Sequence, residues 1–165
     1  MSIDYFERSR RLLLVEPDRT LWSILAVSLR GLAHVDPVAD FQTARARVWR
    51  ASLFKAPFDF LVTNMQLGAY NGLQLVDLLV TTGLPTRSLV YTDRLEAAWG
   101  EEVQRAGAFY EIRARLPYAL PAYLLAQLPA VDRRGVTIPE RRAQPRGGRR
   151  RSDEPMDGPP GSVSA

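Results

Sequence analysis

The sequence predicts an α/β fold: an open sheet of five parallel strands in the order 2-1-3-4-5, with helices on both faces. Three observations support this prediction. The chain has 165 residues, 46% of them hydrophobic, so it is long and apolar enough to form one domain with a sizeable core. Short apolar runs alternate with longer segments of helical period. Such alternation favours parallel pairing through βαβ crossovers, for which this strand order is common.

Five short apolar runs are expected to be the strands. They lie at 11–15 (RLLLV), 34–38 (HVDPV), 58–63 (FDFLVT), 88–92 (SLVYT) and 109–112 (FYEI). The second run contains Pro37, which cannot donate a backbone hydrogen bond, so we expect this strand at an edge of the sheet. Pro17 follows the first run, where a residue without an amide hydrogen suits the end of a strand.

Five amphipathic segments are expected to contain the helices. They lie at 20–32, from the cap at 40 to about 53, at 72–82, at 95–106 and within 117–128. Asp18, Asp40 and Asn71 stand where a side-chain oxygen can cap the first three helices. In the second helix, the period places Val48 and Trp49 inward.

The composition changes after the last predicted helix. The formal net charge of the chain is +4, and residues 132–165 hold eight Arg against five acidic residues, which leaves only +1 for the rest. This segment is rich in Pro, Gly and Arg and poor in aliphatic residues, so it is expected to be disordered. We therefore expect an N-terminal extension at 1–9, a folded domain at 10–131 and a disordered tail at 132–165.

Several function classes are excluded by composition. The chain has no cysteine and a single histidine, His34, so disulfides, zinc-thiolate sites, thiol catalysis and histidine-based triads are excluded. No apolar run is long enough to span a bilayer, and the opening MSIDYFERSRR is too charged for a signal peptide. We expect a cytoplasmic protein that does not bind membranes, is not an enzyme and needs no cofactor.

Polar residues stand at the ends of three predicted strands. Glu16, Pro17 and Asp18 follow the first strand, Asn64 follows the third, and Thr92 ends the fourth. The carboxyl ends of parallel strands meet at one edge of the sheet, where ligands and chemistry are usually found in this architecture. These positions are therefore the candidate site.

The order and spacing of these segments resemble the receiver domain of two-component response regulators, over about residues 10–130. LLLVEPD resembles the first strand with its acidic pair, and FDFLVTNMQLGAYNGLQLVDLL resembles the third strand, the phosphoacceptor loop and the next helix. LVYTD resembles the fourth strand with its switch hydroxyl at Thr92. AGAFYEI and LPYALPAYLLA resemble the fifth strand and the start of the last helix. The resemblance implies a flavodoxin-like fold of the CheY-like type.

The chain departs from the family at the phosphoacceptor itself. The resemblance implies a carboxylate where Asn64 stands, eight residues before Gly72. An amide is a poor nucleophile and cannot form the mixed anhydride with phosphate. The acidic pair becomes Glu16 and Pro17, which leaves one carboxylate where the family holds Mg²⁺ with two. No metal is expected, apart from a weak residual cation site at Glu16.

The lysine of the fifth strand is also missing. The chain has one lysine, Lys55, which lies far from this strand in sequence. One alignment with the family places Arg113 at the lysine position, as a possible replacement, and another places Leu116 there. The sequence therefore indicates a degenerate pseudo-receiver: a phosphorylation-independent, regulatory protein-binding module of two-component or phosphorelay signalling.

The expected partner is a protein, such as a histidine kinase. The resemblance implies a partner-binding face between the fourth strand and the last helix. That region contains Tyr91, Trp99, Tyr110 and Tyr118, residue types that either anchor an interface or pack in the core.

Two alternatives stay open. A receiver of this kind could accept phosphate at a non-standard carboxylate such as Asp18 or Asp93. The tail could instead bind nucleic acid through its basic patch, because arginines neutralise phosphates, although a solvated tail has the same composition. The patch consists of Arg146, Arg149, Arg150 and Arg151.

Overall fold

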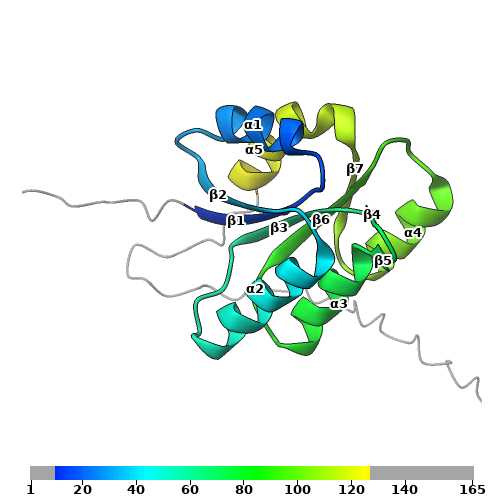
Figure 1. The fold of residues 1–165 in the computed structure, drawn as a ribbon. Coiled ribbons are helices and arrows are strands. Elements are labelled where there is room, and N and C mark those ends of the chain that lie inside the picture. Colours follow the sequence, from blue (N-terminus) through cyan, green and yellow to red (C-terminus); the bar gives the residue numbers. More distant parts are fainter. Residues whose placement is uncertain (1–9, 127–165) are drawn as a thin grey trace, which may run out of the picture. The chain divides into compact units, whose positions relative to one another are not determined.

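A five-stranded parallel sheet forms the centre of residues 10–126, the part of the chain that this computed structural model describes. The strand order is β2-β1-β3-β6-β7, and each pair of neighbours is parallel (Figure 1). The five strands are β1 (Arg10–Val15), β2 (Ala33–Val38), β3 (Phe60–Asn64), β6 (Arg87–Thr92) and β7 (Phe109–Ile112). Counted along the chain, this is the predicted order 2-1-3-4-5, which is confirmed, as is the edge position of the proline-containing strand.

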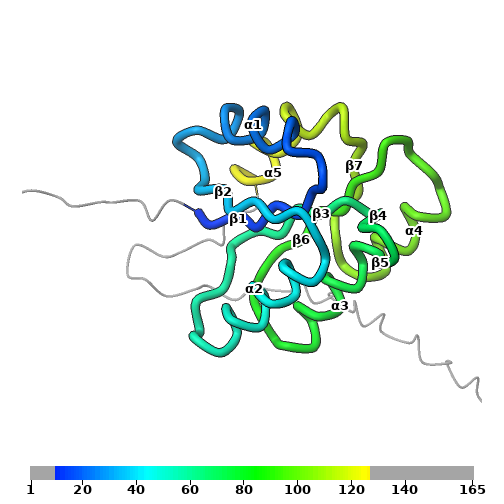
Figure 2. Tube along the Cα trace, viewed as in Figure 1, coloured from blue at the N-terminus to red at the C-terminus, as the bar shows by residue number. Residues whose placement is uncertain are grey.

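Helices cover both faces of the sheet. They are α1 (Arg19–Ser28), α2 (Phe41–Leu53), α3 (Leu73–Thr81), α4 (Ala97–Arg105) and α5 (Leu116–Ala126), with a 3₁₀ turn η1 (Arg113–Arg115) before α5. α1 and α5 lie together on one face, and α2, α3 and α4 lie on the other (Figures 1 and 2). The fold class predicted from the sequence is thus the observed one.

The two faces of the sheet belong to two separate apolar cores. Side chains alternate along a strand, so Leu12 and Leu14 of β1 pack with α1 and α5, whereas Leu13 and Val15 pack with α2, α3 and α4. All four side chains are fully buried. Since both faces are covered, β1 is a continuous apolar run, which is why the sequence shows no alternation there.

Two aspartates cap helices as predicted. The Asp18 side chain accepts a hydrogen bond from the Thr20 N–H at 2.8 Å, and the Asp40 side chain accepts one from the Thr43 N–H at 2.8 Å. These bonds favour the charged carboxylates, so the pKa of each aspartate lies below its usual value.

Trp49 differs from the prediction. It is 44% exposed, whereas Val48 is fully buried. The buried residues of α2 are Phe41, Ala44, Val48 and Ala51. Trp49 follows Val48 by one residue, a rotation of about 100° around the helix axis, which turns its side chain away from the core.

A glycine lets α3 begin close to the end of β3. A Cβ on Gly72 would lie 2.3 Å from the backbone oxygen of Asn64. The segment between them forms a two-stranded hairpin, β4 (Gln66–Leu67) and β5 (Tyr70–Asn71). The residue at the cap position of α3 is Gly72, and Asn71, where the cap was predicted, accepts a hydrogen bond from the Leu73 N–H at 2.8 Å. The asparagine–glycine corner therefore fixes the path of the chain beside the candidate site.

The predicted extension at 1–9, the predicted tail at 132–165 and the basic patch within it lie outside the described residues. Between residues 10 and 126, no helix is long and apolar enough to cross a membrane.

Candidate functional site

The register of the sheet brings three polar residues into one row. Asn64 on β3 pairs with Tyr91 on β6, and Val15 on β1 pairs with Thr63 on β3, so that Glu16 follows at the level of Asn64. Strand alternation then turns all three side chains toward the face covered by α1 and α5. The three residues therefore lie together at the carboxyl edge of the sheet, where the sequence placed Glu16 and Asn64.

Glu16 is the centre of this row. Its side chain is almost completely buried, with 1% of the residue exposed. One carboxylate oxygen accepts the Asp18 backbone N–H at 2.7 Å. The other accepts the Tyr91 hydroxyl, the Asn64 Nδ2 at 3.2 Å and the Arg113 Nη1 at 3.4 Å. Because buried charge is costly unless it is hydrogen-bonded, these donors stabilise the carboxylate. We call the five residues the Glu16 network.

The amide of Asn64 serves this network in a way that a carboxylate could not. Its Nδ2 donates to Glu16, and its Oδ1 accepts the Gln66 backbone N–H at 3.0 Å. An ionised aspartate at this position could accept from Gln66 but has no proton to donate to Glu16. Asn64 therefore completes a hydrogen-bonded cluster.

Arg113 supplies the positive charge. It begins the turn after β7, and its Nη2 lies 2.5 Å from the Asp18 Oδ2 while its Nη1 lies 3.4 Å from Glu16. Leu116, the other residue proposed for the lysine position, is fully buried in the core under α1 and α5. Of the two positions, the structure places only Arg113 beside the acidic residues.

Tyr91 was predicted as part of a partner face, and this is wrong. The residue is fully buried, and its ring belongs to the core between the sheet, α1 and α5. Burial, followed by the hydrogen bond to Glu16, raises the pKa of its hydroxyl. Tyr91 is therefore a neutral donor inside the protein and not a surface residue.

Thr92 joins a second hydrogen-bonded chain on the other side of β6. Its hydroxyl donates to the Arg94 backbone oxygen at 2.5 Å and lies 2.8 Å from the Tyr110 hydroxyl. The Glu96 N–H in turn donates to Tyr110 at 3.2 Å. These bonds hold Tyr110 against the loop between β6 and α4.

The remaining aromatic residues of the predicted face differ in exposure. Trp99 is partly buried and packs against the core under α4. Tyr118 is 83% exposed on α5. Only Tyr118 of the four offers most of its surface to a partner.

The residues present do not fit a magnesium site. Mg²⁺ requires oxygen ligands in near-octahedral geometry. The Glu16 oxygens already accept four donors, Asp18 is bonded to Thr20 and Arg113, and Pro17 has no ligand atom in its side chain. Within the described part of the chain, no group of three His, Cys, Asp or Glu residues lies close enough to hold a metal.

Two members of this arrangement were missed from the sequence. The Tyr91 hydroxyl reaches Glu16, and the Trp22 Nε1 donates to the Glu16 backbone oxygen at 2.7 Å. For Tyr91 the sequence contained a signal. It lies two residues after Leu89 in the same strand, so both side chains point into the same core. For Trp22 no such signal existed, since its contact depends on the turn that Pro17 makes.

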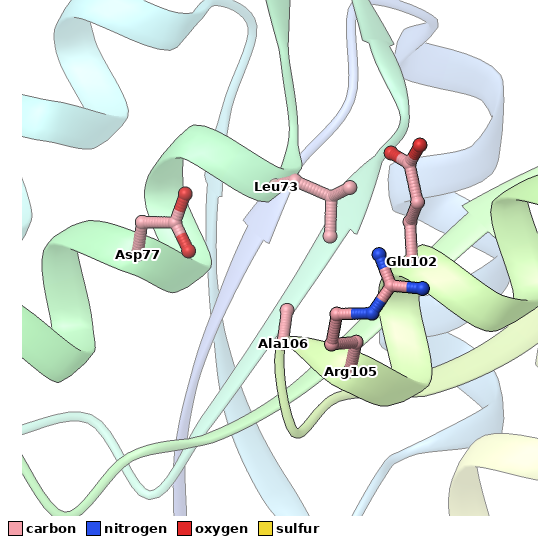
Figure 3. A pocket seen from close by; sticks show the side chains of 5 residues that line it. All are labelled: Leu73, Asp77, Glu102, Arg105 and Ala106. Atoms are coloured by element: carbon pink, nitrogen blue, oxygen red, sulfur yellow. The ribbon is translucent and has the colours of Figure 1, made fainter.

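A hollow of about 320 Å³ lies between α3 and α4 (Figure 3). Asp77 reaches it from α3, and Glu102 and Arg105 reach it from α4. None of its lining residues belongs to the Glu16 network, and its charges are mixed. This hollow is therefore separate from the candidate site.

Solved structures show which proteins share this fold. The chemotaxis protein CheY4 of Vibrio cholerae aligns with a TM-score of 0.61 and 19% sequence identity, covering 73% of this chain and 99% of that one. A response regulator of Burkholderia pseudomallei, solved with a phosphorylated aspartic acid and a calcium ion, gives 0.60 and 22%, covering 70% and 66%. A two-component response regulator of Clostridium difficile gives 0.59 and 16%, covering 72% and 98%.

At sequence identities of 16%, 19% and 22%, these alignments show a shared fold. The chain has the architecture of response regulator receiver domains, as the resemblance implied. No protein-family model matches the sequence, and no curated protein matches it either.

Proposed function

We propose that this chain is a receiver-type signalling module that works without phosphorylation and regulates a protein partner in a two-component or phosphorelay system. In this proposal it has no catalytic activity of its own. The observation that carries it is the Glu16 network. At the position where a receiver has its phosphoacceptor, an amide donates a hydrogen bond to the acidic residue that would otherwise help to hold a cation.

Two features of the network support phosphorylation independence. The Asn64 side chain cannot accept a phosphoryl group as an aspartate does. The Glu16 carboxylate is satisfied internally by four donors, so a cation would have to displace at least some of them. A module that is not phosphorylated signals through its abundance or through its partner.

The test is incubation of the full chain with acetyl phosphate and Mg²⁺, followed by intact-mass measurement at neutral pH. The expected result is an unchanged mass. A gain of one phosphoryl group would contradict the proposal, and fragment masses would then show whether Asp18, Asp93 or another residue carries it. Asn64→Asp is the matched variant, and it is also expected to stay unmodified, because Pro17 still stands in place of a second acidic residue and the strand-five lysine of the family is still missing.

The partner is proposed to bind near the exposed Tyr118 on α5. Aromatic side chains of this kind are typical anchors of protein interfaces. Affinity capture with the wild-type chain and with Tyr118→Ser should differ in one retained signalling protein, for example a histidine kinase. Equal capture by both baits would remove Tyr118 from the interface while leaving the phosphorylation result untouched.

A further inference from the structure

A second hollow lies at the opposite edge of the sheet from the Glu16 network. It has a volume of about 380 Å³ and lies beside the end of α2, the start of β1 and the segment before β3. The strands are parallel, so the start of β1 and the Glu16 end of β1 lie at different edges. The side chains that matter here are Arg11, Arg47, Arg50, Phe54 and Phe58. We call this the α2 hollow.

The three arginines of the α2 hollow differ in how firmly they are held. Arg11 lies 4.7 Å above the Phe58 ring, and its Nη1 donates to the Ala56 oxygen at 3.1 Å. Arg47 makes one ion-pair contact with Asp36 at 3.3 Å. A guanidinium has five N–H donors, so both retain donors for a ligand.

Arg50 is the most available of the three. Its guanidinium lies 5.7 Å from the centre of the Phe54 ring, and the described residues include no ion-pair or hydrogen-bond partner for it. A cation stacked on an exposed ring is positioned but not neutralised. Arg50 therefore presents an unpaired charge next to an apolar surface.

Two exposed apolar side chains lie at the end of α2. Phe54 is 70% exposed and Leu53 is 77% exposed. α2 itself carries three arginines and no acidic residue. Exposed apolar side chains rimmed by polar or charged residues are typical of binding surfaces.

We propose that the α2 hollow binds an acidic peptide segment of a partner protein. Carboxylates of the peptide pair with Arg50 and Arg47, because the guanidinium fork matches a carboxylate in geometry and charge. An aromatic or aliphatic side chain of the peptide packs against Phe54. Charge complementarity and the exposed Phe54 ring support this site, and none of its lining residues belongs to the Glu16 network.

The same residues are poorly arranged for nucleic acid. Single-stranded binding needs several exposed rings for successive bases, whereas Phe58 is buried beneath Arg11 and Phe54 is the only exposed ring of the hollow. Asp36 and Asp59 also lie beside the arginines, through the ion pair to Arg47 and a hydrogen bond from the Arg11 backbone N–H. A continuous phosphate backbone would meet these carboxylates, whereas a peptide can place its few charges between them.

The test measures binding of a fluorescein-labelled peptide that alternates Glu with Leu and Phe to the full chain, by fluorescence anisotropy at physiological salt. Arg50→Glu is expected to weaken binding about tenfold or more, since it replaces an attractive charge with a repulsive one. Arg30→Glu makes the same charge change at an exposed turn outside the hollow and should leave the affinity unchanged. Amide chemical shifts in α2 should move on titration with the peptide.

Three results would overturn the proposal. The first is no saturable binding by the wild-type chain. The second is an equal loss of affinity for Arg50→Glu and Arg30→Glu, which would show unspecific attraction by net charge. A loss of affinity only when Arg149, Arg150 and Arg151 are replaced by serine would count in the same way, because it would assign the binding to the tail. The third is tighter binding of a labelled single-stranded oligonucleotide that Arg50→Glu abolishes, which would assign the hollow to nucleic acid.

Discussion

Glu16 is 1% exposed, and three side chains and one backbone N–H donate to its carboxylate. Removing one donor from a buried acceptor costs more than an average hydrogen bond, because the acceptor keeps its desolvation and loses its partner. At the scale of single residues, each donor of the network should therefore make a measurable contribution to the free energy of unfolding. Its contributions can be separated by substitutions that delete one donor at a time.

The first prediction concerns Tyr91. Tyr91→Phe keeps the buried ring and removes the hydroxyl that donates to Glu16. We expect a loss of about 2 kcal/mol in the free energy of unfolding, as for hydrogen bonds to charged groups. Denaturant unfolding of the full chain at neutral pH gives this value. Tyr118→Phe, on an 83% exposed residue, is the control and should change stability by less than about 0.5 kcal/mol. Equal stability of both variants would mean that water can replace the Tyr91 hydroxyl.

The second prediction concerns the pH dependence of Asn64→Asp. The change removes the donor 3.2 Å from Glu16 and places a second carboxylate there. Burial and the neighbouring charge should raise the pKa of the new group above its unfolded value of about 3.9. When an acid has a higher pKa in the folded state than in the unfolded state, the protein loses stability as the pH rises from the unfolded-state pKa to the folded-state pKa. Above the folded-state pKa the loss is constant. Each tenfold weakening of the new acid on folding corresponds to about 1.4 kcal/mol of lost stability at neutral pH.

Unfolding curves of Asn64→Asp at several pH values check this sign. The variant should approach wild-type stability in acid and fall behind it toward neutral pH. Asn71→Asp is the matched control, because the Asn71 side chain accepts from the Leu73 N–H and an aspartate can do the same. If Asn64→Asp were as stable as the wild type at neutral pH, the pocket around Glu16 would be open to solvent.

At the scale of elements, the sequence predicted most of the fold because the central strands β1, β3 and β6 contain short apolar runs. The strand predicted at 11–15 is observed at Arg10–Val15, and the one predicted at 88–92 is observed at Arg87–Thr92. Caps could also be predicted, since Asp18 and Asp40 act on neighbouring N–H groups. These features depend on local sequence, so periodicity and residue type are sufficient to find them.

The Glu16 network was harder to predict. Tyr91 is 75 residues from Glu16 in the sequence, and Arg113 is 97 residues away. Their contacts depend on the register of three strands and on the direction of the turn after β7, neither of which has a local signal. The sequence predicted which strand ends meet at this edge of the sheet, but not the hydrogen bonds that Tyr91 and Arg113 donate to Glu16.

The third prediction belongs to the junction of β3 and α3. A methyl group on Gly72 would lie 2.3 Å from the Asn64 backbone oxygen, so Gly72→Ala must displace backbone. We expect a loss of about 2 kcal/mol or more, as for overpacked sites. Gly100→Ala is the comparison, because its new Cβ would lie 3.3 Å from the flexible Tyr110 ring and alanine favours a helix. The melting temperature of Gly72→Ala should lie well below that of Gly100→Ala. The reverse order would contradict the close approach of Gly72 to the Asn64 backbone oxygen.

At the scale of the whole molecule, the two edges of the sheet have different characters. The carboxyl edge, where receivers carry their chemistry, is closed by hydrogen bonds around Glu16. The amino edge carries the α2 hollow with exposed Phe54 and the unpaired Arg50. If both proposals hold, the chain keeps the receiver fold, and its ligand-binding surface lies at the opposite edge of the sheet from the position at which receivers are phosphorylated.

The fourth prediction follows from this closure. A ligand that binds only the folded state stabilises it by about 2.7 kcal/mol at a concentration of one hundred times its Kd. Mg²⁺ with beryllofluoride, a phosphoryl mimic, should therefore raise the melting temperature of any receiver that retains its site. For this chain we expect a shift of less than about 1 °C, because Glu16 and Asp18 are already bonded within the protein.

The control for this measurement is a receiver whose third strand ends on aspartate, measured in the same buffer, where a shift of several degrees is expected. A comparable rise in this chain would show that cation and phosphoryl mimic displace Tyr91, Asn64 or Arg113 from Glu16. In that case Tyr91→Phe should increase the rise further, since it removes a competing donor. Loss of the rise in Glu16→Gln would then place the cation at Glu16 itself.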